Sequence, residues 1–263
     1  MNVIILPAFN EESSINHVLN TLDSTIKEHN EEFVIVICND GSTDKTLEEI
    51  RKSSQILATP VHLIDHSYNR GLGETIRDLL EAAVLLADKD NDVIIRMDCD
   101  KTHNPKYIPE LLNEIHKGFD VVTTSRFFKD GGQTGVTSIR RIISRLANMY
   151  MKLFFPIKGL REYTCGYRAY RSTIIKKALL IYGNDFLQLK EFGFTCTLEK
   201  IVKLNLLGAS FSEIPFVLNY EMKTSKSKMV FSSTTLGYFI LAILCYWPFG
   251  GWKFRNFKGM TET

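Results

Sequence analysis

Short apolar runs alternate with amphipathic stretches along the first half of the chain. The runs are rich in β-branched residues, as strands buried on both faces are, and they cover 3–6, 33–38, 61–64, 93–97 and 121–124. Between them, apolar residues recur at helical spacing, as they do from Ile15 to Ile26. This alternation predicts an α/β fold, with a mostly parallel central sheet flanked by helices.

The alternation stops after about residue 130, where longer helical patterns follow. Apolar positions from Ile139 to Leu153 predict one long amphipathic helix, and shorter helices are expected near 174–181 and 197–204. A strand-like run at 209–217 comes next. We expect one large domain over residues 1–230.

An apolar segment and a polar tail over residues 231–263 form a predicted C-terminal helical extension. Its apolar stretch, 236–249, is shorter than the roughly 17–25 residues that span a bilayer. Aromatic residues followed by cations resemble an interfacial belt, which predicts peripheral membrane contact. The alternatives are a helix packed on the main domain and a contact in a homodimer. The belt residues are Tyr246, Trp247, Trp252, Lys253, Arg255 and Lys258.

Polar motifs follow the predicted strands, where parallel sheets bind their ligands. If the strands are parallel, these motifs meet at one edge of the sheet. They are Pro7-Ala8-Phe9-Asn10-Glu11, Asn39-Asp40-Gly41-Ser42-Thr43-Asp44, Arg70-Gly71-Leu72-Gly73, Asp98-Cys99-Asp100 and Ser125-Arg126.

The pair Asp98 and Asp100 is the clearest candidate for chemistry. Residues two apart on an extended segment point the same way, so both carboxylates can hold one hard divalent cation. Mg²⁺ or Mn²⁺ bound there would neutralise a diphosphate leaving group. The plain alternative is a turn with two solvated carboxylates. Among the histidines, we expect only His103 to lie near the site.

A second candidate is Asp40, at the end of the second strand. Gly41 permits a tight turn, and one of the next three residues can cap the helix that follows. This structural interpretation leaves Asp40 unexplained. A carboxylate there can accept hydrogen bonds from a nucleobase N–H or a ribose hydroxyl.

Arginines supply candidate anion sites, because guanidinium groups bind phosphate bidentately. We favour this role for Arg126 and Arg168, which lie beside aromatic residues. Adjacent helix positions face about 100° apart, so the pattern leaves Arg140 and Arg141 as alternatives.

Composition narrows the class of protein. Lys plus Arg is 32 and Asp plus Glu is 30, a net charge of +2, which does not predict a nucleic-acid partner. Five widely spaced cysteines without a CxxC pair favour reduced thiols in the cytoplasm. The N-terminus lacks a basic region and is expected to be the first strand, not a signal peptide.

In this order the motifs resemble family 2 of the inverting glycosyltransferases, which adopt the GT-A fold. The likeness covers roughly residues 2–230 and is greatest to the dolichol-phosphate (polyprenyl-phosphate) mannose synthase group. Besides the strand-end motifs, it includes His103-Asn104-Pro105, Gly131-Gly132 and Thr164-Cys165-Gly166-Tyr167-Arg168-Ala169-Tyr170.

The resemblance implies roles for individual residues. The metal, Mg²⁺ or Mn²⁺, would be held by Asp98 and Asp100, with Cys99 between them in the sugar-nucleotide site. Arg126 and one of Arg140 and Arg141 would meet phosphate. In the mechanism that we expect, Arg126, Arg140 and Arg168 would orient the acceptor phosphate during catalysis. The nucleoside would be held by Pro7, Phe9, Glu11 and Asp40.

The implied activity is metal-dependent transfer of one hexosyl unit, mannose or glucose, from a GDP- or UDP-sugar to a polyprenyl phosphate. The enzyme would then lie on the cytoplasmic face of a membrane. A second hypothesis keeps the donor and replaces the acceptor by a hydroxyl, with Glu191 or Glu199 as the base. A third is a donor-binding protein without activity.

Two positions depart from the family pattern. Thr102 stands where relatives often carry Gln or Ser, and Asn219 stands where they usually carry Arg. If that arginine contacts phosphate in relatives, Lys223, Lys226 or Lys228 must supply the charge here.

Overall fold

The computed structural model describes residues 1–29, 31–223, 230–247 and 251–254. Its main sheet contains β1 (Asn2–Ala8), β2 (Phe33–Asn39), β3 (Val61–Asp65), β4 (Val93–Arg96), β5 (Val121–Ser125), β7 (Arg168–Arg171) and β8 (Phe211–Pro215). The strand order is β3-β2-β1-β4-β7-β5-β8. Every pairing is parallel except those of β7, which is antiparallel to β4 and β5. The predicted, mostly parallel sheet is confirmed.

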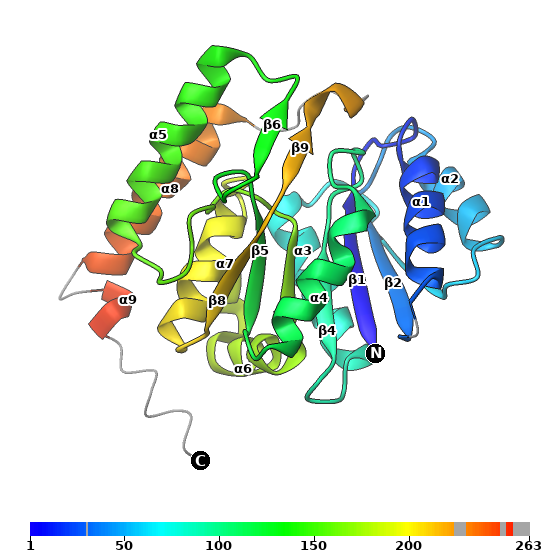
Figure 1. Cartoon of the computed structure of the whole chain (residues 1–263), viewed down its shortest axis with the longest axis horizontal. Coiled ribbons are helices and arrows are strands. Elements are labelled where there is room, and N and C mark those ends of the chain that lie inside the picture. Colours follow the sequence, from blue (N-terminus) through cyan, green and yellow to red (C-terminus); the bar gives the residue numbers. More distant parts are fainter. Residues whose placement is uncertain (30, 224–229, 248–250, 255–263) are drawn as a thin grey trace.

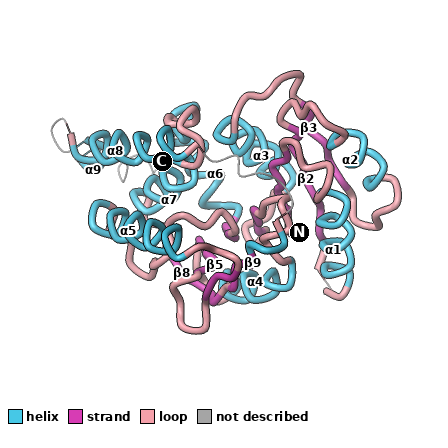
Figure 2. Tube along the Cα trace, turned by 90° about the horizontal axis from the view of Figure 1, so that it is seen from above, coloured by secondary structure: helices cyan, strands magenta, loops and turns pink. Residues whose placement is uncertain are grey.

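Helices cover both faces of this sheet (Figures 1 and 2). One face packs against α1 (Ile15–Lys27), α2 (Thr46–Ser54) and α4 (Ile108–His116). The other packs against α3 (Leu72–Leu86), α6 (Ser172–Tyr182) and α7 (Thr195–Leu206). Alternate residues of a strand face opposite sides, so Ile4 belongs to the first core and Val3 to the second. Both sides of the central strands are therefore apolar.

Strand β7 is a strand of the main sheet that the sequence pattern does not predict. It lies between β4 and β5, where Arg168 is opposite both Arg96 and Thr123. Because β7 runs against its neighbours, the residues that precede it arrive at the carboxyl ends of β4 and β5. The segment Thr164–Tyr167 therefore joins the edge where the polar motifs meet.

A two-stranded sheet lies beyond the carboxyl ends of the main strands, at the upper edge of Figure 1. It pairs β6 (Gly132–Thr134) with β9 (Val217–Asn219), and the short helix η3 (Tyr220–Met222) follows β9. The predicted single strand at 209–217 thus divides after Pro215. The buried Phe216 separates β8 from β9 and donates its N–H to Ser125 O at 3.0 Å.

Helices α5 (Ser138–Phe154) and α8 (Phe231–Tyr246) pack together at one side of the molecule (Figure 1). The rings of Tyr150 and Phe239 lie 5.4 Å apart between centroids, and the Tyr246 hydroxyl donates to Phe154 O. Leu241 and Cys245 of α8 are buried in the same core as α7. The division of the chain at residue 230 stays a prediction, and α8 shares its core with the main domain.

Among the described residues, no helix combines the length and apolar character that crossing a bilayer requires. Trp252, in α9 (Gly251–Phe254), is 7% exposed, and Lys203 Nζ lies 4.2 Å from its ring centroid. It is therefore not part of an outward-facing belt, contrary to our expectation. Arg255 and Lys258 of that belt lie outside the described residues.

Candidate active site

The carboxyl ends of the parallel strands meet at one edge, as the sequence predicts (Figure 1). Pro7 lies within β1, opposite Cys38, and Phe9 follows that strand. Glu11 is buried; its carboxylate accepts from Ser14 Oγ at 2.6 Å, and its N–H donates to Thr46 Oγ1 at 2.7 Å. The three expected nucleoside contacts from β1 thus lie beside the end of β2.

Asp40 is buried at the end of β2, and main-chain donors occupy both of its carboxylate oxygens. Arg70 N donates to Oδ1 at 2.8 Å, and Gly71 N donates to Oδ2 at 3.0 Å. His66 Nδ1 lies 2.8 Å from Oδ1. In this structure Asp40 fixes the loop before α3. Its contact with a nucleoside stays a prediction, and His66 is a site residue that the sequence analysis missed.

Gly41 explains why this turn is so close to that loop. It has φ +61, and a Cβ there would lie 2.2 Å from the carbonyl carbon of Tyr68. Any other residue would push the loop away from Asp40.

Asp98 and Asp100 follow β4, and each carboxylate faces a cation. Arg96 Nη2 donates to Asp98 Oδ1 at 3.3 Å, and Lys223 Nζ forms an ion pair with Asp100 Oδ2. Thr102 donates its N–H at 3.1 Å and its hydroxyl at 2.5 Å to Asp100 Oδ1. Burial alone would raise the pKa of Asp100, but the neighbouring His103, Lys223 and Thr102 hold that pKa below its ordinary value. Asp100 is therefore held as a carboxylate.

Arg96 is a second residue that the sequence analysis missed. Its side chain is fully buried, and Nη1 donates to Thr197 Oγ1 at 2.9 Å. A Cβ at Gly166 would lie 2.9 Å from its guanidinium carbon, so only glycine fits there without a shift. The available signal was a charged residue within an apolar strand.

His103 lies beside the pair, as predicted. Its Nδ1 accepts the N–H of Asp98 at 2.9 Å, which places the proton of the neutral ring on Nε2. Nε2 is 3.8 Å from Asp98 Oδ2. The ring stacks on Tyr167, with centroids 5.1 Å apart. The segment before β7 thus orients the histidine that supports the turn.

Arg126, at the end of β5, is bound bidentately by a buried carboxylate. Its Nε and Nη2 donate to Glu162 at 2.7 and 2.9 Å, and Nη1 donates to Gln133 Oε1 of β6 at 3.2 Å. Burial would raise the pKa of Glu162, but the Arg126 charge keeps it below its ordinary value. Arg126 thus links the end of β5 to β6 through Gln133 and to the segment before β7 through Glu162. The phosphate role of Arg126 stays a prediction.

The remaining predicted arginines lie in two different environments. Arg168 is fully buried and donates to Thr197 O at 3.0 Å and to Tyr163 O at 2.7 Å, so its surroundings do not support the expected phosphate contact. Arg140 and Arg141 are exposed at the start of α5. This helix begins at the same end of the molecule as the candidate site (Figure 1).

Asn219, the departure from the family pattern, joins the two strands of the small sheet. Its Oδ1 accepts from Thr134 Oγ1 and from Glu221 N, both at 3.1 Å. Among the candidate replacement cations, Lys223 reaches the carboxylates, whereas Lys226 and Lys228 lie outside the described residues.

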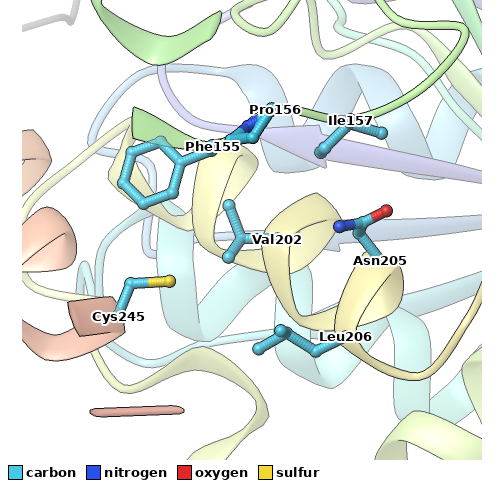
Figure 3. A pocket seen from close by; sticks show the side chains of 7 residues that line it. All are labelled: Phe155, Pro156, Ile157, Val202, Asn205, Leu206 and Cys245. Carbon is cyan, nitrogen blue, oxygen red and sulfur yellow. The ribbon is translucent and has the colours of Figure 1, made fainter. Parts of the chain in front are cut away.

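The bases considered for a hydroxyl acceptor are placed elsewhere. Glu199 is buried and accepts the N–H groups of Gln188 and Leu189 at 2.8 and 2.9 Å. Glu191 is exposed. A cavity lined mostly by apolar side chains also lies away from the strand ends, between α7, α8 and the segment after α5 (Figure 3).

The donor set fits a divalent cation that takes its other ligands from a substrate. No group of three or more His, Cys, Asp or Glu side chains able to hold a metal occurs in the part of the chain that the structure describes. Two carboxylates are the typical protein share of a Mg²⁺ site that substrate phosphates complete. The Lys223 ammonium shows that Asp100 already attracts a cation.

Solved structures share this architecture. Over 93% of this chain and 78% of theirs, two structures of glucosyl-3-phosphoglycerate synthase from Mycobacterium tuberculosis superpose with TM-scores of 0.61 and 0.59. Their sequences are 16% and 15% identical to this chain. One holds Mn²⁺ and UDP, and the other Mg²⁺ and UDP. This likeness shows the GT-A fold that the sequence resemblance implied.

Curated relatives are closer in sequence. An undecaprenyl-phosphate 4-deoxy-4-formamido-L-arabinose transferase of Pseudomonas fluorescens is 30% identical over 67% of this chain and 48% of its own length. A dolichol-phosphate mannosyltransferase of Pyrococcus furiosus is 27% identical over 87% of this chain and 60% of its own length. The chain thus spans about half to three fifths of these relatives.

The family model for glycosyl transferase family 2 matches residues 3–179. This match includes the strand ends that carry Asp40, Asp98, Asp100 and Arg126. The chain belongs to glycosyl transferase family 2.

Proposed function

We propose that the protein transfers a single hexosyl unit, mannose or glucose, from a GDP- or UDP-sugar to a polyprenyl phosphate with inversion. The observation that carries this proposal is the pair Asp98 and Asp100 at the end of β4, where the Lys223 ammonium already contacts Asp100. The names of the two curated relatives support the acceptor, because both act on polyprenyl phosphates.

The site suits an acceptor that is already an anion. A phosphate oxygen is a nucleophile at neutral pH without a strong general base. The carboxylates of Asp40, Asp100 and Glu162 already accept from donors of the protein. Catalysis then depends on holding acceptor and donor in line. A Mg²⁺ or Mn²⁺ held by Asp98 and Asp100 would stabilise the charge of the departing diphosphate.

A hydroxyl acceptor remains the second candidate because Asn219 replaces the usual arginine. That reaction needs a base near the donor. Glu199 is fixed by main-chain donors, and Glu191 is exposed, so neither is poised for this role. The geometry favours the phosphate acceptor.

Nucleoside diphosphate release tests the proposal. The protein is incubated with Mn²⁺ or Mg²⁺ and a panel of GDP- and UDP-sugars, with and without a short polyprenyl phosphate. We expect release that requires the lipid phosphate and disappears in Asp100→Ala. Release independent of the lipid would favour the hydroxyl acceptor, and donor binding without release would favour a non-catalytic protein.

We also propose that α5 and α8 rest on an anionic bilayer, where a polyprenyl phosphate would be presented. Large apolar side chains of α5 form one stripe and are 41–75% exposed. The stripe continues over exposed positions of α8, and the Tyr150–Phe239 contact joins the two helices. Its members are Ile139, Ile142, Ile143, Leu146, Met149, Leu153, Leu236, Phe239, Ile243, Tyr246 and Trp247.

The charges around the stripe favour an anionic lipid surface as its partner. Basic residues flank the stripe on α5, and neither α5 nor α8 contains Asp or Glu. An apolar face bordered by cations is typical of helices that lie in the headgroup region of anionic membranes. The flanking residues are Arg140, Arg141, Arg145 and Lys152.

Co-sedimentation with vesicles containing phosphatidylglycerol tests the surface. Ile142→Ser combined with Leu146→Ser should reduce the bound fraction, whereas Leu180→Ser, at an exposed leucine of α6, should not. Equal binding by all three proteins would exclude this face. If the protein forms a dimer in solution, and the double substitution dissociates it without changing vesicle binding, the stripe is a contact with a second copy of the chain.

A further inference from the structure

Lys223 occupies the position at which a cation meets the second carboxylate of the site. It follows η3, and its ammonium forms an ion pair with Asp100 Oδ2. The two side chains are only 15% and 12% exposed. The other oxygen of Asp100 accepts both donors of Thr102. Both oxygens of Asp100 therefore accept from donors of the protein, and the one at Oδ2 is the Lys223 ammonium.

The cation beside Asp98 differs in its freedom to leave. Arg96 is fully buried, and Thr197 and the backbone at Gly166 surround its guanidinium. Lys223 reaches Asp100 from the rim, on a flexible four-carbon stem. A divalent cation that binds Asp100 through Oδ2 must compete with this ammonium, because two cations cannot share the same lone pairs.

We infer that Lys223 holds the metal position of the free protein and moves from Asp100 to a phosphate of the substrate when the metal–diphosphate complex binds. The inference rests on the proposed function, since it requires a metal–diphosphate site. Lys223 would then contact the substrate and supply the positive charge that Asn219 lacks.

The small sheet keeps the lysine close to the site after it leaves Asp100. Asn219, four residues before Lys223, accepts from Thr134 of β6, and Arg126 donates to Gln133 of the same strand. The backbone that carries Lys223 is thus attached to the end of β5. Only its side chain needs to move for the ammonium to exchange a carboxylate for a phosphate.

The inference predicts effects of opposite sign for two ligands. Lys223→Met should bind Mn²⁺ alone about fivefold to tenfold more tightly than the unaltered protein, because a charge-assisted contact no longer competes. It should bind nucleoside diphosphate in saturating Mn²⁺ more weakly, because a phosphate contact is lost. A merely structural ion pair predicts the same direction for both ligands.

The measurement is Mn²⁺ binding followed by electron paramagnetic resonance, then titration with GDP and UDP. Lys117→Met is the matched control, because it removes the same charge from a surface pair with Glu114 and should change neither affinity. Lys223→Arg should bind Mn²⁺ no more tightly than the unaltered protein, since a guanidinium holds the carboxylate bidentately. Thermal melting reveals whether Lys223→Met is folded. If it is not, Lys223→Gln, which also removes the charge, is expected to change the two affinities in the same opposite directions.

The outcomes separate this inference from the proposed function. Mn²⁺ binding that Asp100→Asn abolishes and Lys223→Met leaves unchanged or weakens would overturn the inference and keep the metal site. Mn²⁺ binding that is insensitive to Asp100→Asn would overturn both. Tighter Mn²⁺ binding with weaker nucleoside diphosphate binding in Lys223→Met would establish the exchange.

Discussion

Asp40 at the end of β2 and Asp100 at the end of β4 are alike in sequence context but differ in their partners. Both are buried aspartates at carboxyl ends of parallel strands. Asp40 accepts main-chain N–H groups of Arg70 and Gly71, whereas Asp100 is balanced on one oxygen by the ammonium of Lys223.

This difference in partners indicates which of the two carboxylates can release its donors and bind another group. Main-chain donors leave Asp40 only if the loop before α3 unfolds. A side-chain ammonium leaves Asp100 by rotating about its own bonds. Burial alone does not distinguish the two aspartates, because both are less than 10% exposed. The type of partner does, because main-chain donors hold Asp40 and a side-chain ammonium holds Asp100. We therefore propose that Asp100, and not Asp40, exchanges its partner for a metal ion.

The largest effect on stability is expected at the end of a third strand, β5, where Arg126 pairs with the buried carboxylate of Glu162. Glu162→Gln removes the buried carboxylate and leaves the guanidinium uncompensated, so we expect a loss of about 3–5 kcal/mol of unfolding free energy. Chemical denaturation measures it. Glu81→Gln, in the surface pair with Arg77, should cost less than about 1 kcal/mol. Equal losses would show that burial of the pair is energetically irrelevant.

The same carboxylate predicts a pH dependence of stability. Arg126 lowers the pKa of Glu162 below its ordinary value of 4.5, although burial opposes the shift. The unfolded state therefore takes up the proton first, and the stabilisation is present above pH 4.5 and lost as pH falls through the lower, folded value. Unfolding free energies measured between pH 6 and about 3 should fall more steeply for the unaltered protein than for Glu162→Gln. Parallel slopes would contradict this assignment.

Asp100→Asn should separate activity from stability. We expect nucleoside diphosphate release to fall by about 10²–10³-fold, the cost of losing one electrostatic group at a developing charge. The melting temperature should change little, because Thr102 can still donate to the amide oxygen. A large loss of stability with retained turnover would reverse our comparison of the two aspartates.

Asp40→Ala should show the opposite balance. Three donors lose their acceptor, so we expect about 2–3 kcal/mol less unfolding free energy. Asp90→Ala, at an exposed loop position, serves as the control in the same denaturation series. If Asp40→Ala is as stable as this control, the loop does not depend on Asp40.

The smallest effect is expected at Asn219. Asn219→Ala removes the acceptor for Thr134 and Glu221 and should cost about 1 kcal/mol. Thermal melting of the variant, with Asn205→Ala on α7 as a comparison, measures it. A shift no larger than experimental error would mean that the small sheet is held by its backbone alone.

The sequence predicts those parts of the molecule that depend on local pattern. Apolar runs identify β1 to β5, and strand polarity brings Asp40, Asp98 and Asp100 to one edge. It does not predict β7, because Arg168–Arg171 lacks an apolar run and is placed by long-range pairing with β4 and β5. Partners distant in the chain, such as Glu162 for Arg126 and Lys223 for Asp100, leave no local signal.

We propose that the site at this edge of the sheet transfers a hexosyl unit to a lipid phosphate. The most direct test is to detect the modified lipid. A short polyprenyl phosphate is incubated with the protein, Mn²⁺ or Mg²⁺ and each GDP- or UDP-hexose, and is then examined by mass spectrometry. We predict the mass gain of one hexosyl unit with one of these donors, and no gain with Asp100→Asn. Nucleoside diphosphate release that leaves the lipid unmodified would contradict the account.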